Sequence, residues 1–268
     1  MSGAGPTIEA ARTEGRAALV GYLPAGYPTV EESIELLGAM VAAGVDVVEV
    51  GLPYSDPVMD GPTIQAAAEV ALARGTRTTD VFRVVEASAA LAPTLVMTYW
   101  NPVERFGVAR FTRALAEAGG AGLITPDLIP EEADEWVAAA DGTGLDKVFL
   151  VAPSSTTARL ERTSAACRGF VYATAVMGVT GAREATSALA PELVARVHDV
   201  TSLPVGVGLG VSDGRQAAEV AAYAEAVIVG SAFVRAIADA DSHSAALAAV
   251  TRLTEDLSAG VRGQRRWA

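Results

Sequence analysis

Short runs of apolar residues alternate with amphipathic segments along the whole chain, and this alternation predicts its elements. Eight of the apolar runs have the length of a strand and are rich in Val, Leu and Ile, without strict alternation of apolar and polar positions. Continuous apolar runs of this kind are typical of parallel strands that are covered on both faces. The predicted strands are residues 17–22, 45–50, 94–100, 122–125, 147–151, 169–175, 204–208 and 226–229.

Segments with helical periodicity lie between the predicted strands. Thr29 and Glu32 fit a capping box that opens a helix, and Gly44 and Gly119 stand where helices are expected to stop. The predicted helices are residues 30–43, 64–74, 80–90, 108–118, 131–140, 157–166, 191–197, 213–222, 233–238 and 244–258.

The order of these elements predicts an α/β fold, a single (β/α)8 TIM barrel, because eight strand–helix units in about 250 residues match that architecture. No linker or low-complexity tract divides the chain, so we expect residues 1–268 to form one domain. Extra helices are expected at the N-terminus, after strand two and after strand eight. A doubly wound open sheet is the alternative, but no Gly-x-Gly-x-x-Gly motif opens a helix after strand one.

Composition narrows the classes of function. The net charge of −12 argues against nucleic acid and against anionic membrane surfaces as partners. A single cysteine excludes an internal disulfide and favours a cytoplasmic location. Residues 1–13 lack the apolar core of a signal peptide, and the apolar stretches are too short for a membrane span.

Two carboxylates stand at and just beyond the end of the second predicted strand. Glu49 stands near the C-terminal end of that strand, and Asp60 stands in the loop behind it, which is rich in Pro and Gly. Catalytic groups of barrel enzymes lie at these strand ends, and two carboxylates in different settings can divide acid and base roles. Each also has a purely structural explanation: Glu49 could accept backbone N–H groups, and Asp60 could serve an Asp-Gly turn.

Glycine-rich loops follow the last three predicted strands. They contain Gly181, Gly210 and the pair Gly230-Ser231. Glycine lets the backbone approach a ligand, and Ser231 could cap a short helix whose N-terminus favours an anion. Ordinary turns are the alternative for any one loop, but glycines after three consecutive strands favour a phosphate site.

Several chemistries lack the residues they need. Lys147, the only lysine, begins strand five at the opposite end of the barrel, so a Schiff-base route is excluded. His198 and His243, the only histidines, do not follow strands, and Cys167 is expected to be a packing residue. Carboxylate acid–base chemistry on a phosphorylated substrate remains, and we expect neither a metal nor another cofactor.

Residues 49–65, Glu-Val-Gly-Leu-Pro-Tyr-Ser-Asp-Pro-Val-Met-Asp-Gly-Pro-Thr-Ile-Gln, resemble the signature of the tryptophan synthase alpha subunit family. The Met-Thr-Tyr-Trp-Asn-Pro segment at 97–102, Pro126-Asp127 and the residues at 178–181 and 230–232 match that family in order and spacing. The likeness spans essentially the whole chain. The first motif is the most specific, whereas the glycine pairs alone would be weak evidence.

The resemblance implies a lyase that cleaves indole-3-glycerol phosphate to indole and glyceraldehyde 3-phosphate by a retro-aldol reaction. It implies that Glu49 transfers protons at ring carbon 3 and the glyceryl hydroxyl, and that Asp60 binds the indole N–H. Tyr172 would orient Glu49 or the substrate. Further substrate contacts are implied for Tyr22, Tyr99, Ile124, Leu150 and Leu209 around the indole, for Gly181, Gly210, Gly230 and Ser231 at the phosphate, and for Thr180 on a closing loop. The three tyrosines could equally be packing residues.

The resemblance also implies a partner, the beta subunit of tryptophan synthase, in a heterotetramer of two alpha and two beta subunits. Pro53, Asp56, Pro57 and residues 101–106 would face it. Pro24, Tyr27, Ala175 and Val176 depart from the commoner family pattern near the site entrance and the closing loop. A free-standing indole-releasing lyase, a phosphosugar isomerase and a catalytically silent, ligand-binding barrel are the alternatives.

Overall fold

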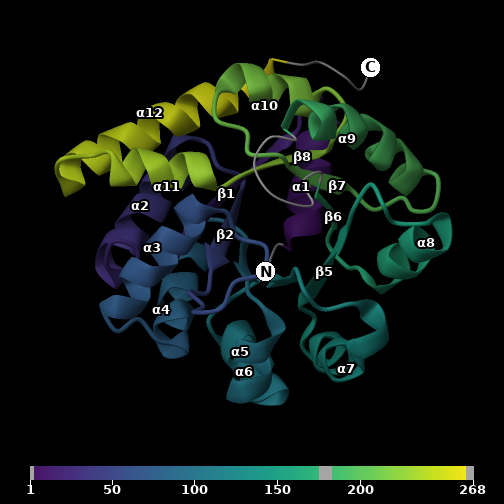
Figure 1. The fold of residues 1–268 in the computed structure, drawn as a ribbon, viewed down its shortest axis with the longest axis horizontal. Coiled ribbons are helices and arrows are strands. Elements are labelled where there is room, and N and C mark those ends of the chain that lie inside the picture. Colours follow the sequence, from purple (N-terminus) through teal and green to yellow (C-terminus); the bar gives the residue numbers. More distant parts are fainter. Residues whose placement is uncertain (1–2, 175–182, 264–268) are drawn as a thin grey trace.

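Eight parallel strands form a closed barrel in the computed structural model of the chain, and β8 pairs back onto β1. The structure describes residues 3–174 and 183–263. Helices surround the ring of strands (Figure 1), so the predicted (β/α)8 barrel is confirmed. The strands are β1 (Ala18–Pro24), β2 (Val47–Gly51), β3 (Thr94–Met97), β4 (Gly122–Thr125), β5 (Asp146–Val151), β6 (Val171–Thr174), β7 (Val205–Gly208) and β8 (Ala226–Val229).

Most helices lie between consecutive strands, as parallel pairing requires. Helix α1 precedes β1, two helices separate β2 from β3, and two follow β8. The helices are α1 (Ala4–Thr13), α2 (Val30–Ala43), α3 (Pro62–Ala73), α4 (Thr78–Ala89), α5 (Trp100–Phe106), α6 (Val108–Glu117), the 3₁₀ turn η1 (Pro130–Glu132), α7 (Asp134–Thr143), α8 (Thr157–Ala166), α9 (Arg183–His198), α10 (Gly214–Ala221), α11 (Ser231–Ala238) and α12 (His243–Arg262).

Alternate side chains of each strand point into the barrel, as the pleat requires. One buried apolar cluster fills the interior, and a larger one packs the outer strand faces against the helices. The interior cluster contains Phe170, which directly precedes β6, and the strand residues Ala18, Val20, Val47, Leu95, Ile124, Val148, Ala226 and Ile228.

Helix α1 closes the end of the barrel at which the strands begin. Its Ala4, Ile8 and Ala11 belong to the interior cluster, and Figure 1 shows the helix within the outline of the ring. The carboxylate of Asp146, the first residue of β5, accepts a hydrogen bond from the backbone N–H of Ala4 at 3.0 Å. The open end of the barrel is therefore the one at which the strands terminate.

The prediction for residues 94–100 is wrong at its end. Strand β3 stops at Met97, and Trp100 begins helix α5, which the sequence pattern did not indicate. The reason is a contact from another loop: the carboxylate of Asp127 accepts the backbone N–H of Trp100 at 2.9 Å. This side chain satisfies one of the N–H groups that a helix start leaves unpaired.

Other boundaries also differ from prediction, and those of α9 and β1 are two examples. Helix α9 begins at Arg183 rather than 191 and continues through Pro191, although proline removes an interior hydrogen bond. Strand β1 extends two residues past Tyr22, because Leu23 and Pro24 still pair with β2. None of the described helices is both long and apolar enough to cross a membrane.

Candidate active site

Glu49 lies inside the barrel on β2, with 1% of its surface exposed. The strand register places it level with Tyr22 of β1 and Leu95 of β3. Its Oε2 has no hydrogen-bond partner among the described residues. A carboxylate satisfied by backbone N–H groups, the structural explanation of this residue, therefore does not account for that oxygen.

The surroundings of Glu49 keep its carboxyl group protonated at neutral pH. Burial, together with the nearby charge of Asp60, raises its pKa to about 8. Burial acts because the ionised form loses its water, and a like charge adds to that cost. A carboxyl group of this kind can deliver a proton near pH 7 and take one back.

Asp60 lies in the loop between β2 and α3, and Tyr99 holds it there. The hydroxyl oxygen of Tyr99 accepts the backbone N–H groups of Met59 at 2.9 Å and Asp60 at 3.2 Å. On the other side, the side-chain amide of Gln65 donates to the carbonyl oxygen of Asp60 at 2.8 Å. Burial raises the pKa of the Asp60 carboxyl, and a hydrogen bond with Tyr99 works against that rise. The two carboxyl groups therefore have different environments.

Two tyrosines point toward this pair from strands β1 and β6. Burial raises the pKa of both Tyr22 and Tyr172 well above the ordinary value, and the charges of Glu49 and Asp60 add to the effect. Both phenols consequently stay neutral and can donate hydrogen bonds to a ligand or to a carboxylate.

Glycines at three strand ends make room for these tyrosine rings. A Cβ atom at Gly230 would lie 3.1 Å from the ring of Tyr22, and one at Gly208 would lie 2.5 Å from the hydroxyl of Tyr172. Gly51 likewise faces the hydroxyl of Tyr22. Part of the glycine pattern at the barrel mouth therefore serves aromatic packing.

The apolar residues predicted around the indole pack against two different clusters. Ile124 is fully buried in the interior cluster, and Leu150 packs against that cluster next to Tyr172, its register partner. Leu209, in contrast, packs against the outer cluster.

The start of helix α11 has the features of an anion site. Gly230 is its N-cap residue and no side chain of the described residues caps the helix, so they leave the N–H groups of the first turn available for a ligand. Ser231 is the first helical residue, which corrects its prediction as the cap. Helix α10 differs, because the carboxylate of Asp213 accepts the N–H of Gln216 at 2.7 Å.

Gly210, in the loop between β7 and α10, has a φ of +71°, a conformation that favours glycine. Apart from Gly210 and its two chain neighbours, no atom of the described residues lies within 4 Å of the place a Cβ would take, so they leave this backbone open to a ligand. Thr180 and Gly181, with Ala175 and Val176, lie outside the described residues. Of the other departures from the family pattern, Pro24 ends β1 and Tyr27 is buried.

The residues set aside from catalysis have other surroundings in the fold. Lys147, in β5, forms an ion pair with Asp141. Cys167 packs half-buried against the outer cluster. His198 ends helix α9 and His243 begins α12. Within residues 3–174 and 183–263, no group of three or more His, Cys, Asp or Glu side chains could hold a metal ion.

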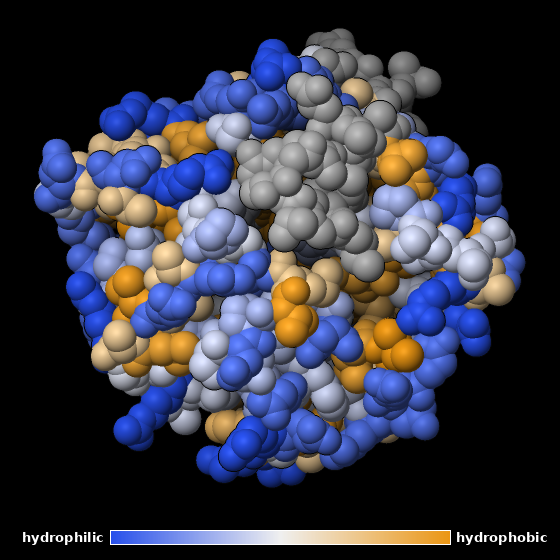
Figure 2. Space-filling model, in the orientation of Figure 1, coloured by the Kyte–Doolittle hydropathy of each residue, from blue (hydrophilic) through white to orange (hydrophobic). Residues whose placement is uncertain are grey.

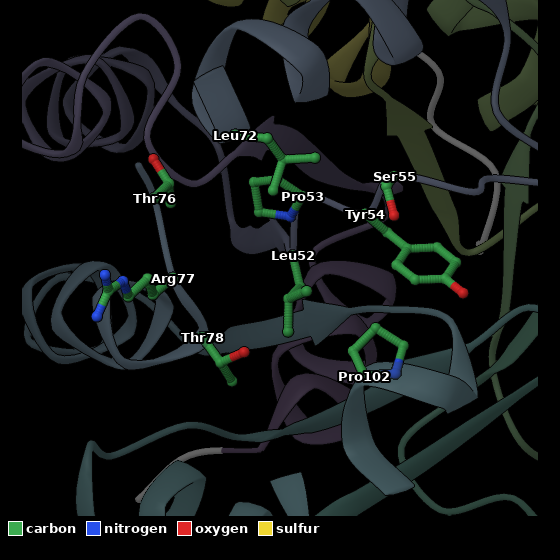
Figure 3. Close-up of a pocket in the computed structure, with 9 residues that line it drawn as sticks. All are labelled: Leu52, Pro53, Tyr54, Ser55, Leu72, Thr76, Arg77, Thr78 and Pro102. Carbon is green, nitrogen blue, oxygen red and sulfur yellow. The ribbon is translucent and has the colours of Figure 1, made fainter. Parts of the chain in front are cut away.

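A surface cavity of about 310 Å³ lies beside the mouth, between the β2–α3 loop, the α3–α4 junction and α5. In Figure 3 the side chains of Leu52, Pro53 and Leu72 lie close together, while Arg77 and Tyr54 extend away from them. Neither Glu49 nor Asp60 lines this cavity. It is therefore a feature of the outer rim, next to the residues for which a partner was predicted.

Known proteins resemble the chain over nearly its whole length. The model of the family described as tryptophan synthase alpha chain matches residues 8–262. The tryptophan synthase alpha chains of Salinispora arenicola and Acidothermus cellulolyticus are 62% and 60% identical to it over 263 residues, which is 98% of each sequence. A chain of tryptophan synthase from Mycobacterium tuberculosis superposes with a TM-score of 0.90 at 55% identity, covering 97% of this chain and 98% of that one. Tryptophan synthase subunit alpha from Legionella pneumophila gives 0.87 at 30% identity, covering 98% and 99%.

Proposed function

Because the chain belongs to the tryptophan synthase alpha chain family, we propose that Glu49 and Asp60 perform that family's reaction here. The chain is a lyase that cleaves indole-3-glycerol phosphate to indole and glyceraldehyde 3-phosphate. One observation carries the proposed assignment: Glu49 is almost fully buried, has a pKa of about 8 and keeps one oxygen without a partner among the described residues.

Glu49 can move a single proton through the whole reaction. Its protonated carboxyl donates to carbon 3 of the indole ring, which turns the ring into a cation that withdraws electrons. The resulting carboxylate then takes the proton from the hydroxyl on the carbon attached to the ring. The bond between that carbon and carbon 3 breaks, a carbonyl forms, and the electron pair returns to the ring. Glu49 ends in the state in which it began, so no other proton donor is required.

Asp60 stabilises the positive charge that develops on the ring. Its carboxylate accepts a hydrogen bond from the indole N–H. An anion held in place next to a forming cation lowers the activation free energy of the cleavage step. Tyr172 orients Glu49 or the substrate hydroxyl, and Tyr22, Tyr99, Ile124, Leu150 and Leu209 line the indole pocket.

The phosphate group binds at the uncapped start of α11, where the N–H groups near Gly230 and Ser231 point outward from the helix end. Gly210 supports this site through its open backbone, and we retain the predicted roles of Gly181 at the phosphate and of Thr180 in covering the substrate. The site needs no basic side chain, which agrees with the acidic composition of the chain.

The chain is an alpha subunit, and the beta subunit of tryptophan synthase is its partner. We place the contact on the β2–α3 loop and α5, in a heterotetramer of two copies of each subunit. Val58 and Met59 are 76% and 41% exposed in that loop, and Asn101 of α5 donates to the hydroxyl of Tyr54 at 2.9 Å, which joins the two segments. Figure 2 shows hydrophobic residues scattered among hydrophilic ones on the visible face, without one continuous apolar patch. We also propose that residues 1–268 form one domain and that the enzyme works in the cytoplasm.

Indole release from indole-3-glycerol phosphate, measured with and without a beta subunit, tests these assignments. Glu49→Gln and Asp60→Asn should lose about 10²–10⁴-fold in kcat while still binding substrate. Glu69→Gln, an exposed carboxylate on α3, is the matched control and should keep parental activity. Turnover by Glu49→Gln at the parental rate would remove Glu49 from its role. Fast cleavage at a rate that the beta subunit does not change would identify a free-standing lyase instead.

A further inference from the structure

Gln65 makes a contact that its place in the helix does not require. It is the fourth residue of α3, and its backbone N–H already bonds the carbonyl of Gly61 at 3.0 Å, as a helix demands. Its half-buried side chain turns back past the helix start, and Nε2 donates to the carbonyl oxygen of Asp60 at 2.8 Å. The side-chain amide therefore binds Asp60, the residue immediately before the N-cap Gly61.

The backbone of Asp60 is consequently held from both sides. Tyr99 accepts its N–H at 3.2 Å, and Gln65 donates to its carbonyl oxygen. Apolar packing contributes little here, because the preceding Val58 and Met59 are 76% and 41% exposed and Gly61 is exposed as well. The place of the Asp60 carboxylate thus depends on these polar contacts.

We propose that Gln65 is a positioning residue for the cleavage reaction. By donating a hydrogen bond to the carbonyl oxygen of Asp60, it holds the Asp60 carboxylate at the indole nitrogen. The proposal rests on the role of Asp60 proposed above. Gln65 acts through Asp60 and does not itself touch the substrate.

The chemistry of the contact calls for an amide. A carbonyl oxygen only accepts hydrogen bonds, so the side chain must carry a donor of suitable length. Methionine matches glutamine in length but has no donor. Glutamate would bring a carboxylate to the carbonyl oxygen and place a second negative charge near Asp60.

Loss of the contact should act on the chemical step rather than on binding. Asp60 stabilises charge that develops during the reaction and is absent from the bound substrate, so misplacing it lowers kcat and leaves KM almost unchanged. A misplacement of about 1 Å can cost up to about 10²-fold in rate. A looser loop also admits water, which lowers the raised pKa of Asp60, whereas an added carboxylate raises it further.

The test compares Gln65→Met and Gln65→Glu with Glu69→Met, an exposed position one turn along α3. For Gln65→Met we expect kcat to fall about 10-fold, with KM within about twofold of the parent and an unchanged melting temperature. The acid limb of the kcat profile should move to lower pH in Gln65→Met and to higher pH in Gln65→Glu. Glu69→Met should match the parent throughout. Equal profiles for all variants, or a loss confined to KM, would overturn the proposal.

A double variant tests the role of Gln65 separately from the proposed role of Asp60. If Gln65 works through Asp60, then adding Gln65→Met to Asp60→Asn should cost nothing more, since the group being positioned is already gone. Independent, multiplicative losses would overturn the role of Gln65 while leaving that of Asp60 intact. Full activity of Asp60→Asn alone would instead overturn the role of Asp60.

Discussion

The hydroxyl group of Tyr99 accepts the backbone N–H of Asp60 at 3.2 Å, although the two residues stand 39 positions apart in the chain. Tyr99 follows β3, and Asp60 belongs to the loop after β2, so a side chain from one strand end fixes the loop of its neighbour. The barrel thus supplies order to a loop that has no regular secondary structure of its own.

Tyr99→Phe should weaken catalysis without disturbing the barrel. The variant leaves the partly buried N–H groups of Met59 and Asp60 without their acceptor. The resulting misplacement of the Asp60 carboxylate should lower kcat by up to about 10²-fold. The phenyl ring keeps its packing against Tyr54, whose centroid lies 5.5 Å away. Steady-state indole release measures the effect. Tyr54→Phe, which removes only the hydrogen bond to Asn101, serves as the control.

The pH dependence of kcat/KM should reveal Glu49 as an acid. Its pKa is raised to about 8, so the protonated form persists through neutrality and is lost as pH rises past that value. If this form starts the reaction, kcat/KM falls above about pH 8. Measurements are best made above pH 7, where the second ionisation of a phosphate, near pH 6, no longer contributes. A profile that stays level to pH 10 would exclude a protonated Glu49 as the starting form.

Glu49→Gln should stabilise the protein at high pH. In the unfolded chain a glutamate ionises near pH 4.3, whereas the buried Glu49 ionises near pH 8. Its contribution to folding is therefore fully present below about pH 4.3 and is lost as pH rises through about 8. Glutamine does not titrate, so the melting temperature of the variant should exceed that of the parent by more than about 2–4 °C at pH 9. Circular dichroism melts at several pH values test this; a difference that is the same at pH 5 and pH 9 would contradict it.

His198 should make a smaller contribution to the free energy of unfolding, and this contribution should be lost at alkaline pH. Its Nε2 lies 3.0 Å from the buried carboxylate of Glu225, and this hydrogen bond raises the pKa of the imidazole despite partial burial. A raised pKa means that the contribution is complete below about pH 6.5 and is lost as pH rises through the folded value. The parent should therefore melt above His198→Gln at pH 6, by at most about 2–4 °C, and lose this advantage by pH 8–9. An advantage that grows with pH would be inconsistent with the ion pair.

Local signals account for the elements that the sequence predicts well. Helices α2 and α8 have the predicted bounds, because Thr29 and Thr156 cap their first turns and Gly44 ends α2 with a φ of +125°. Such signals lie within a few residues of the boundary they set. The barrel follows from them, since eight alternating units leave few other arrangements.

Contacts between distant segments account for what the sequence pattern misses. The cap of α5 comes from Asp127, 27 residues beyond Trp100, so an aromatic run could be taken for the end of a strand. Glu49 and Asp60 can be recognised from the sequence, because one acid stands at the end of a strand and the other in the loop that follows it. The contact between Gln65 and Asp60, however, requires the path of a loop that turns through Gly61 and Pro62, which no periodicity describes.

The single lysine decides which reagents can map the contact with the beta subunit. Lys147 has 10% of its side chain exposed and is paired with Asp141, on the far side of the barrel from the β2–α3 loop. Amine-reactive cross-linkers therefore find only this shielded group and the chain's amino terminus, and a lysine-directed map would be blank even for a tight complex. Carbodiimide activation of carboxylates, of which the chain offers 32 including Asp56 in that loop, is the labelling chemistry suited to it.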